Sequence, residues 1–228
     1  MTYVAWVSTE GGGPPSGELT WYFGDHPAGG TMPGSSNPAT VARDEFVARL
    51  AETITWEDWE GEGPYGPWEA GTSLDGVEIV RNGVTADFAG TASAVVSGEN
   101  SGRFNVDPPG FISELFCETQ LRNETLDVRE FVMNFAPPIV AWGAFLTDLG
   151  DFSGSPISIE ITKFGGGAES YELTPGGELD GMLHFIGFVD DSGATYTSIR
   201  IHVVDANTGA ADGVGLDDIY WCDASGLA

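Results

Sequence analysis

The chain has 228 residues, of which 41% are hydrophobic and 11% aromatic, enough apolar surface for a sizeable folded core. Its 35 acidic residues outnumber its eight basic ones, so the formal net charge is -27. A surface of this sign repels phosphates, which argues against nucleic acid and anionic membranes as partners. No run of eighteen apolar residues occurs, so no membrane span is predicted.

Residues 1–38 are rich in Gly, Pro and Ser and contain two apolar patches, at 3–7 and 19–23, each long enough for a strand. We predict an N-terminal arm or extra hairpin here, followed by one β-sandwich domain at residues 39–228. Because both patches carry Trp, the arm is expected to pack onto another chain or onto the edge of the sandwich. The beginning of the chain does not have the basic and apolar regions of a signal peptide.

One helix is predicted, at residues 38–53, with Pro38 in its first turn. Glu45 and Arg49 lie four residues apart, in the order that favours an ion pair along a helix. Apolar residues recur at helical spacing and predict a buried face. These residues are Ala42, Phe46, Val47 and Leu50.

Later segments change to the two-residue period of strands. Isoleucines alternate with polar residues at 157–161 and again at 199–203, which predicts two half-buried strands. Nearly continuous apolar runs at 140–146 and 183–189 predict central strands covered on both faces. Turns are predicted at 137–138, 165–167, 175–177 and 191–193. Strands at this spacing indicate an all-β protein, an antiparallel β-sandwich or jelly roll with one short N-terminal helix.

The sequence leaves the state of its two cysteines open. A bond between Cys117 and Cys222 would close a long loop and stabilise the fold by about 4–5 kcal/mol. Two separate buried thiols are the alternative, since no cysteine-rich framework exists. The three histidines, His26, His184 and His202, are scattered and are expected to be structural residues with satisfied hydrogen bonds.

Several segments resemble, in order and spacing, parts of the secreted bacterial PEP-CTERM exoproteins. Residues 41–46 (VARDEF) are similar to the family's short "ARDAF" helix, and 55–61 to the strand that follows it. Residues 102–105 (GRFN), 144–152, 184–188 and 212–219 are similar to later family segments. The resemblance spans residues 41–222 and implies a calcium-binding jelly roll that is extracellular and non-enzymatic. The family's signal peptide and its C-terminal sorting tail have no counterpart in this sequence.

Clustered carboxylates are the candidate metal ligands. Calcium takes six to eight oxygen ligands, and carboxylates crowded together are costly without a cation. Ordinary turn and capping roles are the alternative for the same residues. In jelly rolls of the resembling type, a Glu near the first core strand shares an ion with an Asp in the last. If 217 and 218 lie in a regular strand, their side chains point to opposite faces. The candidates are Glu60, Asp148, Asp151, Asp212, Asp217 and Asp218.

Aromatic residues crowd a Gly- and Pro-broken acidic stretch and offer a possible glycan platform, because sugars stack on exposed aromatic faces. Core packing is the alternative. The candidates are Trp56, Tyr65 and Trp68. Motifs for nucleophilic, zinc-dependent or phosphate-binding chemistry do not occur, so no catalytic residues are assigned and no enzyme is expected.

These patterns predict a non-catalytic structural or adhesion protein displayed on the surface of an extracellular assembly. A secreted-type sandwich without an export signal suggests release by lysis as a phage virion decoration or fibre component, by analogy of fold. A bacterial exoprotein of the same fold is the related alternative. A carbohydrate-binding jelly roll is the alternative from another class. Protein partners in a surface assembly, a glycan and calcium are the expected partners, and the expected location is extracellular or on the virion.

Overall fold

The structure, a computed structural model, describes part of the chain in separate ranges. They are residues 19–27, 38–50, 55–57, 77–81, 84–90, 93–97, 106, 115–121, 123–124, 127–128, 130–148, 157–173, 182–203 and 212–227.

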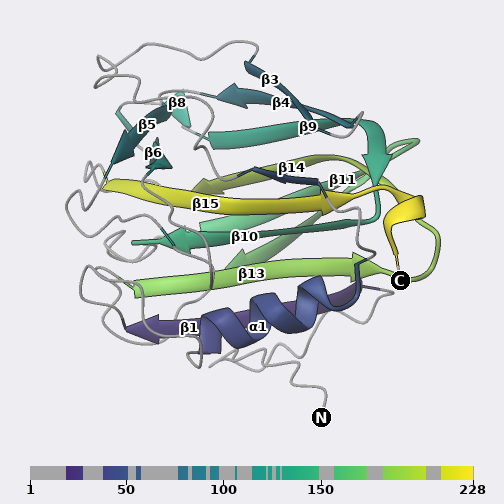
Figure 1. Ribbon diagram of the computed structural model, residues 1–228. Helices are drawn as coiled ribbons and strands as arrows, with labels where there is room; N and C mark the ends of the chain where they lie inside the picture. Colours follow the sequence, from purple (N-terminus) through teal and green to yellow (C-terminus); the bar gives the residue numbers. More distant parts are fainter. Residues whose placement is uncertain are drawn as a thin grey trace.

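The described chain folds as two antiparallel sheets packed face to face, with one short α-helix near the N-terminus (Figure 1), which confirms the predicted fold class. The larger sheet has the strand order β1-β13-β10-β15-β6-β5, with β2 also paired to β15. Its strands are β1 (Leu19–Pro27), β2 (Thr55–Glu57), β5 (Ser93–Ser97), β6 (Leu115–Leu121), β10 (Ala141–Thr147), β13 (Met182–Asp190) and β15 (Asp212–Cys222).

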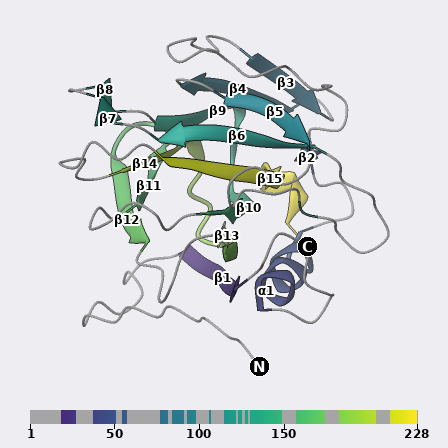
Figure 2. The same cartoon turned by 90° about the vertical axis from the view of Figure 1, so that its left-hand side faces the viewer.

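The smaller sheet has the strand order β12-β11-β14-β9-β4-β3. Figure 2 shows this sheet on the side of the molecule away from α1. Its strands are β3 (Val77–Arg81), β4 (Val84–Gly90), β9 (Glu130–Ile139), β11 (Ile157–Lys163), β12 (Ala168–Leu173) and β14 (Tyr196–Val203). A separate pair consists of β7 (Asn123–Glu124) and β8 (Asp127–Val128), and a short 3-10 helix, η1 (Ala224–Gly226), follows β15.

The two predicted central strands are confirmed, because every residue of β10 is buried and β13 is buried from 183 to 190. One face of these strands contributes to the core between the sheets, which includes Trp142 and Phe188. The other face lies under α1 (Pro38–Val47) and contributes to a second cluster, which includes Phe46 and Phe185. The helix thus explains why the runs are apolar on both faces.

Phe46 enters the sheet surface at two glycines. A Cβ built on Gly143 would lie 2.9 Å from Phe185 Cζ and 3.1 Å from Phe46 Cε1. On Gly187 it would lie 3.0 Å from Phe46 Cδ2. Gly143 and Gly187 are cross-strand partners on β10 and β13, so together they form one socket for the Phe46 ring.

The helix begins at Pro38 as predicted but ends at Val47, not near residue 53. Its last turn tightens, since Arg49 N donates to Phe46 O and Leu50 N donates to Val47 O. Leu50 then forms a β-bridge with Leu227, which pulls the chain out of helical geometry.

The half-buried strands at 157–161 and 199–203 are confirmed as β11 and β14, with Ile159, Ile161, Ile199 and Ile201 fully buried. The turns at 165–167 and 191–193 are confirmed, whereas 175–177 lies outside the described residues. The turn predicted at 137–138 is wrong. Both prolines lie inside β9, where the pairing with β14 shifts register, so the irregular ladder accommodates residues that cannot donate a hydrogen bond.

Of the two N-terminal patches, 19–23 forms a strand and 3–7 lies outside the described residues. β1 pairs antiparallel with β13 and forms one edge of the larger sheet. Trp21 enters the core between the sheets and contacts Tyr171 of β12, with ring centroids 4.8 Å apart. The chain division at residue 38 stays a prediction, although β1 itself adds to the sandwich.

The register separates the two cysteines. Cys117 of β6 pairs with Leu216 of β15, and Cys222 lies six residues further along that strand. At about 3.3 Å per residue, less one bulged residue, the two Cα atoms are roughly 17 Å apart. A disulfide requires less than about 7 Å, and Cys222 is a free, buried thiol. Separate thiols are therefore the correct alternative.

Candidate functional site

The smaller sheet presents a polar face to the outside. Along β11 and β14 the isoleucines point into the core, so the residues between them lie on the opposite face. We call this surface the outward face. Its exposed or partly exposed polar members are Asn134, Glu160, Thr162, Ser170, Ser198 and Arg200. Val132, the partner of Arg200 on β9, is a half-buried apolar member of the same face, and Ser158 on β11 is buried.

The outward face has an ion pair at its centre. Arg200 Nη1 lies 3.6 Å from Glu160 Oε1, and the two side chains are 31% and 30% exposed. Ser170 is the cross-strand neighbour of Glu160, while Thr162, Ser198 and Asn134 form the next row. Four neighbouring strands at about 4.8 Å spacing make a row roughly 14 Å long. Hydrogen-bond donors and acceptors are therefore held on rigid strands across an extended surface.

An exposed aromatic ring lies at one end of this sheet. Phe164, at the tip of the β11–β12 hairpin, is 68% exposed. Its backbone N donates to Thr195 O at 2.8 Å, which ties the hairpin to the β13–β14 loop. The three glycines that follow have φ values between 91° and 108°, which side chains other than glycine rarely adopt. Lys163 Nζ lies 2.6 Å from Glu169 Oε1 and lowers the pKa of that carboxyl.

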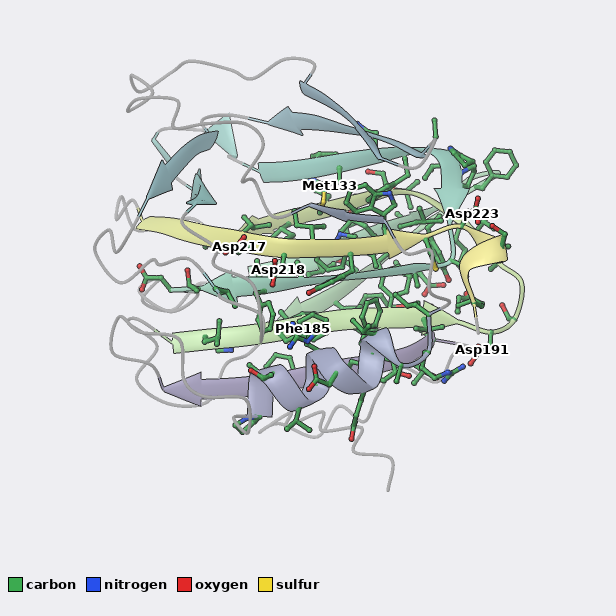
Figure 3. The ribbon with its side chains drawn as sticks, viewed as in Figure 1. Met133, Phe185, Asp191, Asp217, Asp218 and Asp223 are labelled. Atoms are coloured by element: carbon green, nitrogen blue, oxygen red, sulfur yellow. The ribbon has the colours of Figure 1, made fainter. Side chains whose placement is uncertain are left out.

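Asp217 and Asp218 lie on the same face of β15, the face on which Tyr220 packs against Phe46 of α1 (Figure 3). The pairing of β15 with β10 shifts between Gly143 and Phe145, and Asp218 has a φ of 45°. This β-bulge adds one residue, so Leu216 and Ile219 both face the core between the sheets. The prediction that the two aspartates point to opposite faces is wrong, because it assumed a regular strand.

Each aspartate has a structural hydrogen bond. Asp217 accepts from Val106 N at 2.7 Å and from the Asp218 N at 2.9 Å, so it fixes residue 106 to β15. Asp218 accepts from Tyr220 Oη at 3.5 Å. Burial, with the nearby charge of Asp218, raises the pKa of Tyr220, which therefore stays a neutral donor.

Arg43 brings positive charge to these acids from the helix. Its side chain is 7% exposed, and Nη1 donates to Tyr220 Oη at 3.4 Å. The guanidinium carbon lies 5.7 Å from the centre of the Phe145 ring, and Nε pairs with Asp44 Oδ1 at 2.6 Å. The arrangement brings together the segment 41–46, Val106 and β15, which are far apart in the sequence.

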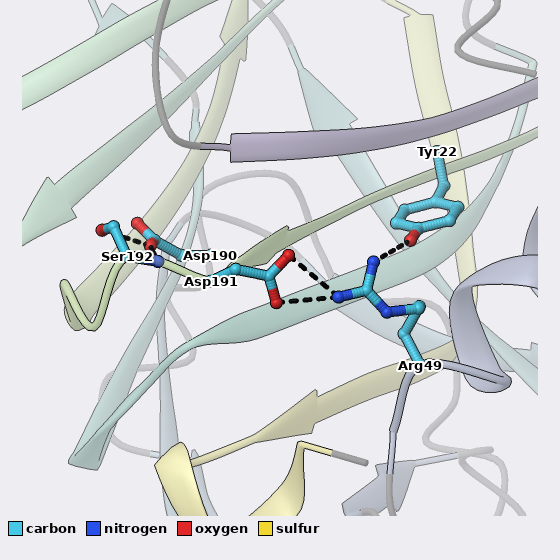
Figure 4. Close-up of polar contacts among 5 residues, drawn as sticks. All are labelled: Tyr22, Arg49, Asp190, Asp191 and Ser192. Carbon is cyan, nitrogen blue, oxygen red and sulfur yellow. Dashed lines mark hydrogen bonds and ion pairs between the residues drawn. The ribbon is translucent and has the colours of Figure 1, made fainter. Parts of the chain in front are cut away.

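A second polar junction joins the end of the helix region to the β13–β14 loop (Figure 4). Arg49 Nη2 lies 2.8 Å from both carboxylate oxygens of Asp191, and Nη1 donates to Tyr22 Oη at 3.3 Å. The predicted partner of Arg49 was Glu45, but Asp191 receives the guanidinium because the helix ends before Arg49.

The six proposed calcium ligands are only partly described. Glu60 and Asp151 lie outside the described residues, and of Asp212 the backbone alone is described, at the start of β15. Asp148 is buried at the end of β10, three positions from the residue paired with Asp217, or about 10 Å away. Among the described side chains, no three His, Cys, Asp or Glu residues gather as a metal would require. Calcium binding stays a prediction.

The proposed aromatic platform also stays a prediction. Trp56 belongs to β2, whose backbone pairs it with Tyr220, while Tyr65 and Trp68 lie outside the described residues. Sequence reasoning missed the outward face and Phe164. The alternation of Ser158, Glu160 and Thr162 indicated one polar face for β11, but only the strand order shows which polar faces join.

Comparison with known proteins identifies no family. No protein-family model matches the chain, and no curated protein sequence matches it. The resemblance to PEP-CTERM exoproteins therefore stays a prediction. One solved structure with a similar sandwich is the family 11 carbohydrate-binding module of a cellulosomal cellulase of Clostridium thermocellum. It is 13% identical, with a TM-score of 0.35, and the match covers 69% of this chain and 97% of the module. A likeness at this level concerns the fold alone.

No helix among the described residues is both long and apolar enough to cross a membrane.

Proposed function

We propose that this chain is a non-catalytic recognition module that binds carbohydrate on the outward face of its smaller sheet. The observation that carries the proposal is the central Glu160–Arg200 pair with hydroxyl and amide side chains beside it on neighbouring strands. Sugar hydroxyls both donate and accept hydrogen bonds, so they match a surface that offers a guanidinium, a carboxylate and an amide together.

The shape of the surface favours a polymer over a small molecule. Small ligands are bound in concave pockets, whereas the outward face is a row of side chains across several strands. Phe164, two residues beyond Thr162 in the β11–β12 hairpin, adds an exposed apolar ring, and apolar rings stack on the CH faces of sugars. The net charge of -27 favours neutral over anionic polysaccharides.

Described buried acids of the larger sheet support a non-catalytic role, because they are used to hold the fold. Asp217 anchors residue 106, and Asp190 accepts from Ser192 N at 2.7 Å and from Tyr196 Oη at 2.5 Å. The module is proposed to act at an extracellular or virion surface, where polysaccharides are met.

Affinity electrophoresis tests the proposal with soluble neutral β-glucan, α-glucan and galactomannan, and with anionic alginate. We expect at least one neutral polymer to retard the protein and alginate not to. Arg200→Met should weaken binding about tenfold or more, since a hydrogen bond to a charged group contributes about 1.5–3 kcal/mol. Arg49→Met is the matched control, because Arg49 is also an exposed, ion-paired arginine but lies beside α1. No retardation by any polymer, or equal binding by both variants, would contradict the proposal.

A further inference from the structure

His184 is a buried histidine without a hydrogen bond. It is 0% exposed on β13, and neither ring nitrogen has a hydrogen-bond partner. The expected satisfied structural role is therefore wrong for this residue. An unbonded imidazole tolerates burial only while it is neutral, because a buried imidazolium would lose its hydration without compensation. Desolvation accordingly lowers the pKa of His184 from 6.5 to about 4.

The position of His184 is next to the edge of the larger sheet. Its neighbours in register are Asp25 on β1 and Leu146 on β10. The Phe23 ring of β1 lies 6.1 Å from the imidazole, between centroids. His184 therefore shares the face of Ile186 and Phe188, which points into the core.

The two flanking strands differ in how firmly they are held. Among the described strands, β10 is paired on both sides, with β13 and with β15, whereas β1 is an edge strand that is paired with β13 and packs against α1. Opening the β1–β13 ladder, together with the contacts of Tyr22 to Phe46 and Arg49, would admit water to His184 and leave the pairing of β10 with β13 and β15 in place. Opening on the β10 side would break the centre of the sandwich. A protonated His184 is thus hydrated at least cost by loss of β1.

We propose that His184 is a pH-sensitive latch, which holds β1 on the sandwich while it is neutral and releases β1 when it is protonated. Release would uncover Trp21 and Phe23 on one side and the edge of β13 on the other, a surface suited to strand exchange. This inference stands independently of carbohydrate binding.

Other ionisable groups around His184 do not reverse the expected effect of protonation, which is to weaken the docking of β1. Register places Asp25 opposite it, and Asp148 two residues beyond Leu146 on β10. Neither nitrogen of the imidazole has a hydrogen-bond partner. Tyr171 and Tyr196, the ionisable members of the core cluster, have pKa values raised by burial and stay neutral in acid.

The lowered pKa of His184 sets how the docking of β1 changes with pH. Because the folded chain binds this proton more weakly than the open chain, the docking of β1 is strongest above pH 6.5 and weakens as the pH falls through 6.5 towards 4. Below pH 4 the ratio of docked to undocked β1 should have fallen roughly 300-fold, the factor that corresponds to a drop from 6.5 to about 4.

Hydrogen exchange, expressed as protection factors for β1 and β10 peptides between pH 7.5 and 4, tests the latch. In the wild type, β1 should lose protection before β10 does. His184→Leu should keep β1 protected over the same range, whereas His202→Leu, a histidine on β14, should behave like the wild type. Two results would overturn the proposal. One is that β1 and β10 lose protection together, and the other is that β1 of His184→Leu loses protection at the same pH as β1 of the wild type.

A second measurement covers the case in which His184→Leu does not fold. In the wild type, the His184 imidazole should titrate by NMR below pH 5, together with the loss of β1 protection. An imidazole that titrates near its ordinary value of 6.5 while β1 remains protected would also overturn the proposal.

Discussion

The Phe46 socket gives a prediction whose size follows from the structure. Phe46→Ala removes a fully buried ring and leaves a cavity between α1 and the sheet, which should cost about 3–5 kcal/mol. Gly143→Ala adds a methyl 3.1 Å from Phe46 Cε1 and 2.9 Å from Phe185 Cζ, so one ring must move, at a cost of about 1–3 kcal/mol.

A double-mutant cycle tests whether the two residues meet. Where Phe46 is already Ala, the added methyl at 143 has space on the helix side, so the combined cost should fall short of the sum by about 0.5–3 kcal/mol. Urea unfolding followed by circular dichroism measures each variant, and Val41→Ala, an exposed site on α1, should change little. Strict additivity of the Phe46 and Gly143 changes would refute the socket.

Three further predictions concern charge, thiols and calcium. Asp191→Asn, which removes the exposed ion pair of Figure 4, should cost less than about 1 kcal/mol, and thermal melts in about 1 M salt should show no difference from the wild type. Mass spectrometry without reductant should find both Cys117 and Cys222 alkylated after unfolding. In the native protein Cys222 should resist alkylation at pH 8, because burial raises its thiol pKa to about 12. Calcium should raise the melting temperature relative to chelator, with roughly 2.7 kcal/mol of stabilisation at a hundred times the dissociation constant. Asp217→Asn and Asp218→Asn should both weaken that response, since the bulge places both on one face; a full response in both variants would place the ion elsewhere.

Local sequence patterns were sufficient to predict several strands and the start of the helix. Alternating isoleucines predicted β11 and β14, and unbroken apolar runs predicted β10 and β13, because burial on one or two faces leaves a direct trace in the order of residues. Pro38 marked the start of the helix because proline is accepted in the first turn, where its missing N–H is not needed.

Features that depend on which strands are neighbours were decided by the tertiary structure. The bulge at Asp218 is a property of the β10–β15 pairing, and it turned two aspartates predicted on opposite faces onto one. Cys117 and Cys222 are kept apart by the register of β6 and β15, not by their distance in sequence.

Taken alone, the sequence determined the all-β class, the start of the short helix and the buried central strands, because each leaves its own periodic pattern in the local order of residues. The tertiary structure alone decided the end of the helix, the partner of Arg49 and the polar outward face around Arg200. These depend on contacts between segments far apart in sequence, such as Leu50 with Leu227 and Glu160 with Arg200, which local periodicity does not encode.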